Sequence, residues 1–274
     1  MPQGWGTYVA DSPATDRPTD IMIQRMMTSA LFAGFAAGLF AALLHFGFVQ
    51  KMIVLGEAYE TGAAVHHPGV APTGPDGHPT EMAAMGAAGV AVASAGHPQG
   101  DDAGAGDAAG PLLRNALTVL FQTLLYCSYA LILVAGFALA QRRGQRVTAR
   151  DGLLWGIAGF VAVQLAPAMG LAPELPGTLA APLMDRQIWW AGTALCAGAA
   201  LVMIGYGRRL GWLAAAVALL ALPHLIGAPE PDGFSGVAPP EVAASFAARS
   251  LGSGLAAWSL MGWLSGWLWD RTPA

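Results

Sequence analysis

The sequence predicts an all-α polytopic membrane protein, a helix bundle with about six transmembrane helices, and three observations support this prediction. The mean hydropathy is +0.50, and only 11% of the 274 residues are charged, whereas about a quarter are charged in soluble domains. Six uninterrupted apolar runs approach the ~20 residues that a helix needs to cross the hydrocarbon core. The charges between those runs divide unevenly between the two sides, as membrane topology predicts.

The six predicted spans contain no acidic residue and a single basic one, Arg249, near an end. They cover residues 26–49, 115–140, 153–171, 187–206, 211–226 and 247–268. The fifth span is short and is followed by Gly227 and Pro229. It therefore crosses the membrane fully or only in part, and a five-span topology stays open.

The segments outside the spans differ in composition. Residues 1–24 contain prolines and aspartates without an apolar period, which predicts a disordered cytoplasmic segment, and Met22 or Met26 could equally be the true start. The first apolar run is too long for a secretory leader, so we expect a retained signal anchor. Residues 25–274 then form the membrane domain, in which 51–114 is predicted to be a flexible outer loop.

The basic residues predict the orientation. With the N-terminus in the cytoplasm, nine of the thirteen Lys and Arg residues lie on the cytoplasmic side, and twelve of the seventeen Asp and Glu residues lie outside. Both termini are then cytoplasmic. An acidic outer surface attracts cations from the medium, although acidic loops are often only solvated.

The long outer loop contains four of the six histidines, among them the adjacent pair His66 and His67. Imidazole and carboxylate groups suit borderline divalent ions such as cobalt, nickel and zinc. The scattered spacing indicates weak capture of a metal ion, and a simple low-complexity linker is the alternative interpretation.

Polar residues also gather near the outer ends of the predicted spans. His45 and His224 lie at similar depth in the first and fifth spans, and polar side chains within spans usually face the bundle interior or a watery cavity. The same layer is expected to hold Gln164, Arg186 and Gln187. A polar vestibule open to the outside is the predicted arrangement, and hydrogen bonds between helices are the alternative.

Several classes of function lack their signatures in the sequence. No span holds an Asp or Glu, which coupled carriers commonly use, and no Walker motif is present. There is no HExxH motif and no Ser/His/Asp grouping, so no enzyme is expected, nor is a nucleic-acid partner. The pairs Gly34 and Gly38, and Gly262 and Gly266, have the spacing that lets helices approach closely.

Three stretches around the third and fourth spans have a specific residue order. They are Gly152–Gly156 (GLLWG), Gln164–Gly177 (QLAPAMGLAPELPG) and Arg186–Trp190 (RQIWW). In these stretches the chain resembles the CbtA family of predicted cobalt-transporter subunits, and the resemblance extends from about Met22 onward. It implies a multi-pass protein of the bacterial inner membrane that is linked to cobalt supply for cobalamin synthesis.

The resemblance also implies a partner, a small single-span subunit that carries histidines, within the lipid bilayer. Families of this kind are often described with five spans. A homo-oligomer is a further possibility that the sequence leaves open.

Together these observations give a hypothesis for the site. A divalent cation, cobalt by resemblance, is the transported or bound ligand, and no catalytic cofactor is expected. Prolines end the third span and place Glu174 at the mouth, where Arg186 could pair with it or with Glu60. The predicted metal ligands are His45, Glu57, Glu60, Glu174 and His224, with His66 and His67 in the loop; Gln164, Arg186, Gln187, Trp189 and Trp190 are expected to shape the mouth. The rival hypothesis is a non-transporting accessory or assembly subunit of a larger membrane complex.

Overall fold

A computed structural model of the chain describes residues 18–65, 110–207, 209–233 and 235–271. Across these ranges the regular structure is helical, apart from an isolated bridge between Thr178 and Gly236. The predicted all-α class is therefore confirmed. Residues 1–17, which belong to the segment predicted to be disordered, lie outside the described residues, as do His66 and His67.

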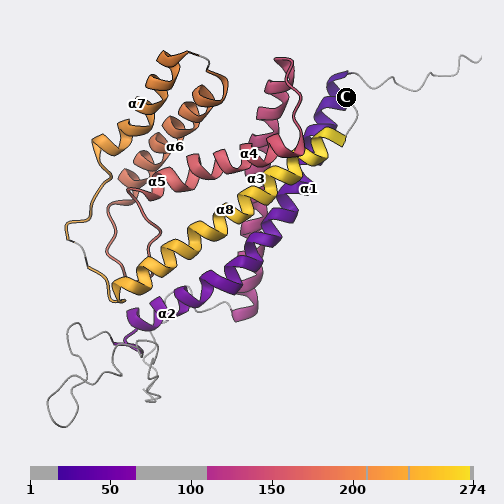
Figure 1. Cartoon of the computed structure of the whole chain (residues 1–274). Coiled ribbons are helices and arrows are strands. Elements are labelled where there is room, and N and C mark those ends of the chain that lie inside the picture. Colours follow the sequence, from indigo (N-terminus) through magenta and orange to yellow (C-terminus); the bar gives the residue numbers. More distant parts are fainter. Residues whose placement is uncertain (1–17, 66–109, 208, 234, 272–274) are drawn as a thin grey trace, which may run out of the picture.

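The described residues form six continuous helical stretches, and each overlaps one predicted span (Figure 1). Two of them contain a π-helical turn, written η. The elements are α1 (Pro18–Leu44), η1 (His45–Val49) and α2 (Gln50–Glu60); α3 (Pro111–Arg142); α4 (Ala149–Phe160), η3 (Val161–Leu165) and α5 (Ala166–Ala168); α6 (Leu183–Tyr206); α7 (Leu210–Ile226); and α8 (Pro240–Arg271).

Four helical stretches are long and apolar enough to cross a membrane: Met22–Glu60, Pro111–Arg142, Ala149–Ala168 and Leu183–Tyr206. They confirm the class of membrane helix bundle. Helix α7 has 17 residues, and at 1.5 Å per residue it reaches about 26 Å, just under the ~30 Å hydrocarbon core. Helix α8 has 32 residues and is long enough to cross. The number of helices that span the bilayer stays a prediction.

Two boundaries differ from the sequence-based expectation. Helix α1 begins at Pro18, so disorder is wrong for residues 18–24; proline suits a first helical turn because the N–H that it lacks would have no partner there. Helix α2 continues to Glu60, so a flexible loop is wrong for residues 51–60, as it is for 111–114 in α3. Gly56 packs against Leu175 and Pro176, a tertiary contact that no local pattern reveals.

Helix α1 packs along α3 with its backbone in close contact. A methyl group added at Gly34 would lie 2.5 Å from Cα of Cys127, and one at Gly38 would lie 2.5 Å from Cα of Thr123. The predicted role of this glycine pair in helix packing is confirmed.

Helix α8 lies between α1 and α4 (Figure 1). Gly262 and Gly266 face glycines of α4: added methyl groups would lie 2.6 Å from Cα of Gly156 and 2.9 Å from Cα of Gly152. This confirms the second predicted pair. The side chains of Phe137, Met261 and Trp269 fill the core beside this contact.

Side-chain contacts define a basic end of the bundle. The buried guanidinium of Arg25 donates to the carbonyl of Trp269 and to Gln141, and it lies 4.2 Å from the centroid of the Trp269 ring. Arg146 forms an ion pair with Asp270 at 3.0 Å. The start of α1, the end of α3, the loop before α4 and the end of α8 therefore meet here.

At the opposite end, called the acidic end, lie the end of α2, the loop that follows α5 and the starts of α6 and α8. The loop residue Gly177 lies beside Glu60 and Val237. The backbone N–H of Leu179 donates to the carbonyl of Ser235 at 3.0 Å. These contacts fix the loop that follows α5, and that loop carries Glu174.

Candidate functional site

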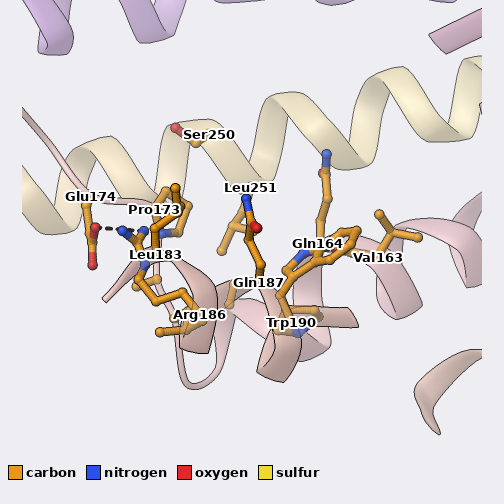
Figure 2. A pocket seen from close by; sticks show the side chains of 14 residues that line it. Val163, Gln164, Pro173, Glu174, Leu183, Arg186, Gln187, Trp190, Ser250 and Leu251 are labelled. Carbon is orange, nitrogen blue, oxygen red and sulfur yellow. Dashed lines mark hydrogen bonds and ion pairs between the residues drawn. The ribbon is translucent and has the colours of Figure 1, made fainter. Parts of the chain in front are cut away.

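A pocket of about 410 Å³ opens at the acidic end between η3–α5, the loop after α5, the start of α6 and α8. Its walls are largely apolar, with residues such as Val163, Pro167 and Leu251. Its polar lining residues are Gln164, Glu174, Arg186, Gln187 and Ser250. Figure 2 shows that they come from three separate parts of the chain. We call it the acidic-end pocket.

The sequence around Glu174 explains how this carboxylate reaches the pocket. The helical stretch ends at Ala168, and Pro173 and Pro176 cannot continue a helix in the chain that follows. Leu175 is buried and anchors the loop, while its neighbour Glu174 lines the pocket. The turn at Gly177 has φ +76, a conformation that favours glycine.

Glu174 and Arg186 form an ion pair across the pocket at 2.9 Å, and each side chain is 30% exposed (Figure 2). Of the two partners predicted for Arg186, Glu174 and Glu60, the structure shows the pair with Glu174. The Nε atom of Arg186 is buried and has no hydrogen-bond partner within the described chain. The guanidinium is thus only partly satisfied, which makes a rearrangement of this pair less costly.

Uncharged oxygen donors complete the lining. Gln164 lies in η3 and fits against α8 where Gly254 has no side chain; a methyl group there would lie 3.1 Å from Cδ of Gln164. The hydroxyl of Ser250 is buried, and no hydrogen-bond partner for it exists in the part that the structure describes. Together with Gln187, these groups offer amide and hydroxyl oxygens beside one carboxylate.

The two histidines predicted as ligands lie outside this pocket. His45 is in η1, where its ring packs edge-on against Phe46 with centroids 5.7 Å apart. His224 packs edge-on against Trp189 with centroids 5.8 Å apart. Neither is among the residues that line the acidic-end pocket.

The predicted carboxylate ligands are also spread out. Glu57 lies 3.9 Å from Arg114, while Glu60 lies beside Gly177. Among the residues that the structure describes, no group of three or more His, Cys, Asp or Glu side chains could hold a metal ion. Of the predicted ligands, the pocket contains Glu174. A metal site made by all of them stays a prediction.

The neighbouring residues Trp189 and Trp190 of α6 were expected to shape the mouth of the site. In the structure each indole N–H donates to a backbone carbonyl at 3.2 Å, that of Trp189 to Pro223 and that of Trp190 to Val163. Trp190 also lines the acidic-end pocket. No local pattern indicates these acceptors, because both belong to distant parts of the chain.

A comparison with protein families matches residues 23–270 to the model described as "Probable cobalt transporter subunit (CbtA)". The chain belongs to the CbtA family. The resemblance seen in the sequence is confirmed, and the CbtA match includes every residue of the acidic-end pocket. Neither the curated proteins nor the solved structures contain a match to this CbtA chain.

Proposed function

We propose that this CbtA-family subunit takes up divalent cobalt and that the cation enters through the acidic-end pocket. The observation that carries the proposal is the partly exposed Glu174 carboxylate, set in a pocket with the oxygen donors Gln164, Gln187 and Ser250. Carboxylate and amide oxygens bind divalent cations, and oxygen ligands alone are most typical of hard ions such as Mg²⁺ and Mn²⁺. The family description therefore supports the choice of cobalt, and the pocket supports a divalent cation. The family description points to transport of cobalt and not to catalysis.

The size of the pocket supports capture of a hydrated ion. At about 30 Å³ per water molecule, a shell of roughly six waters needs about 180 Å³, which is less than the 410 Å³ of the pocket. The ion can therefore exchange its waters one at a time for protein oxygens. Arg186 opposes it, because the guanidinium and the cation compete for the same carboxylate.

The distribution of charge supports a direction of uptake. Glu57, Glu60 and Glu174 lie at the acidic end, whereas Arg25 and Arg146 lie at the basic end. The acidic end then faces the outside of a bacterial inner membrane, where its field concentrates cations, and both termini lie in the cytoplasm.

The family is described as a subunit, which implies a partner. We propose the small single-span, histidine-bearing protein that the family resemblance implies, and a link to cobalamin synthesis on the same ground. If the pair does not transport cobalt, the chain is instead an accessory or assembly subunit of a larger membrane complex.

The test is cobalt-57 uptake by cells that express this chain with that partner. We expect Glu174→Gln to lower uptake by about tenfold or more, because the neutral amide loses the charge that attracts the ion. Glu241→Gln, at the start of α8 and outside the pocket, is the matched control and keeps uptake. Equal uptake by the two variants at equal membrane levels would contradict the proposal.

A further inference from the structure

A second and larger cavity, of about 930 Å³, lies between α3, α4 and α6. Its walls include Ile132, Leu154 and Leu201, and small residues such as Gly198 leave room within it. It reaches Gln145, Arg146 and Tyr206 at the basic end. The cavity therefore runs from the middle of the bundle to the end opposite Glu174.

The two cavities meet at two shared residues. Val163 and Trp190 line both the acidic-end pocket and the second cavity. Figure 2 shows them side by side at one end of the acidic-end pocket, away from Glu174. The indole ring of Trp190 thus stands where the two spaces adjoin.

A hydrogen bond holds Trp190 in this position. The Val163 carbonyl belongs to the π-helical turn η3, a wider turn than an α-helical one and frequent at functional sites. It accepts the Trp190 indole N–H at 3.2 Å. This contact joins α6 to the helix that continues α4, and a change of the tryptophan rotamer would break it without breaking either helix.

The far mouth of the second cavity is polar. Asp151 lines it, and its carboxylate also accepts hydrogen bonds from the backbone and side chain of Thr148 at the start of α4. Arg146, which lines the same mouth, is paired with Asp270. An ion that leaves through this mouth would therefore pass a carboxylate and end among water-exposed groups.

We propose that the two cavities form one path for the cation and that the indole of Trp190 closes it between them. This inference takes the identity of the ion from the proposed function. It adds the position at which the path is closed. An apolar neck stops ions because water leaves it. The volume of the second cavity, about 930 Å³, exceeds the roughly 180 Å³ that six waters occupy at about 30 Å³ each, so a hydrated ion fits once the ring moves.

Thiol labelling tests this closure without any metal. In a background with Cys127→Ala and Cys196→Ala, a reporter Gly198→Cys is placed in the second cavity, where an added Cβ atom has nothing within 4 Å. A positively charged, membrane-impermeant methanethiosulfonate is then applied to each face of sealed vesicles of both orientations. Labelling needs a water-filled route from that face to the thiol.

With Trp190 present, we expect labelling from one face only, that of the basic end. Trp190→Ala should open the second route and make labelling fast from both faces. Trp190→Phe keeps a ring and loses the N–H donor, so we expect a rise of about two- to tenfold from the acidic-end face, the size set by one lost hydrogen bond. Trp189→Phe loses the equivalent bond to Pro223 outside both cavities and should change nothing.

Two results would overturn the inference. Absence of labelling from both faces would show that lipid or another helix fills the second cavity, and an unchanged rate in both Trp190 variants would show that the ring closes nothing. Uptake of cobalt-57 tests the identity of the ion separately. If the labelling rates change as expected but no cobalt is taken up, the path is supported and cobalt is rejected as its ion. Size-exclusion profiles show whether each variant is folded. If Trp190→Ala does not fold, the labelling rate of Trp190→Phe from the acidic-end face tests the closure by itself.

Discussion

The glycines of α4 and α8 and the glycines of α6 have opposite surroundings. Gly156 and Gly262 bring two backbones together, so that a single added methyl group would collide with the facing helix. In α6, Gly192, Gly198 and Gly205 have nothing within 4 Å of an added methyl group. The first set builds a rigid scaffold, while the second leaves space, and both cavities border α6. One side of this molecule is closely packed, and the other leaves open space beside α6.

The largest expected effect comes from breaking the scaffold. Gly262→Leu forces α8 away from α4, and we expect a loss of about 3 kcal/mol in the free energy of unfolding, with little protein left in the membrane. Thermal unfolding in detergent measures it. Gly252→Leu on the same helix, where an added Cβ atom has nothing within 4 Å, is the control. Equal losses of stability in the two variants would contradict the comparison.

The next effect concerns the buried guanidinium of Arg25, which joins α1, α3 and α8 at the basic end. Arg25 is 8% exposed and donates to Trp269 and Gln141. Arg25→Gln should cost about 2 kcal/mol of stability, since hydrogen bonds from a charged donor are lost in a buried place. The melting temperature reports this loss, and a variant that melts like the parent would show that the contact is dispensable.

A smaller effect is expected on the cavity side. Arg186 is paired with the carboxylate that binds the cation in the proposed function, and partly exposed pairs contribute up to about 1 kcal/mol. Arg186→Gln should therefore lower the half-saturating cobalt concentration for uptake, by about fivefold at most. The concentration dependence of cobalt-57 uptake decides this, and a higher half-saturating concentration would mean that Arg186 assists binding.

The smallest effect is expected for the exposed ion pair of the basic end. The side chain of Arg146 is 80% exposed although it lies 3.0 Å from Asp270. Arg146→Gln should change stability by less than about 0.5 kcal/mol, because water screens such pairs. A loss as large as that of Arg25→Gln, measured by the same thermal unfolding, would show that exposure does not separate the two arginines.

The sequence predicted those features that local patterns encode. Apolar runs located six helical stretches, glycine spacing identified Gly34, Gly38, Gly262 and Gly266 as packing residues, and prolines placed Glu174 near Arg186. These predictions succeed because hydrophobicity, small residues and helix breakers act mainly on their own segment of chain.

Features that depend on distant parts of the chain could not be predicted. Nothing local indicates that η3 interrupts α-helical geometry or that Val163 accepts the indole of Trp190. The helical course of residues 51–60 depends on packing against Leu175. His45 and His224 were grouped with Glu174 by depth alone, and depth does not say which face of the helix turns toward the pocket.

The central claim, that a cation binds at Glu174, is tested most directly by equilibrium cobalt binding to the purified chain in lipid nanodiscs. Isothermal titration calorimetry of the parent, Glu174→Gln and Glu241→Gln compares the pocket carboxylate with one outside it. The account predicts that Glu174→Gln loses a binding event that Glu241→Gln retains. Identical binding by all three proteins would contradict it.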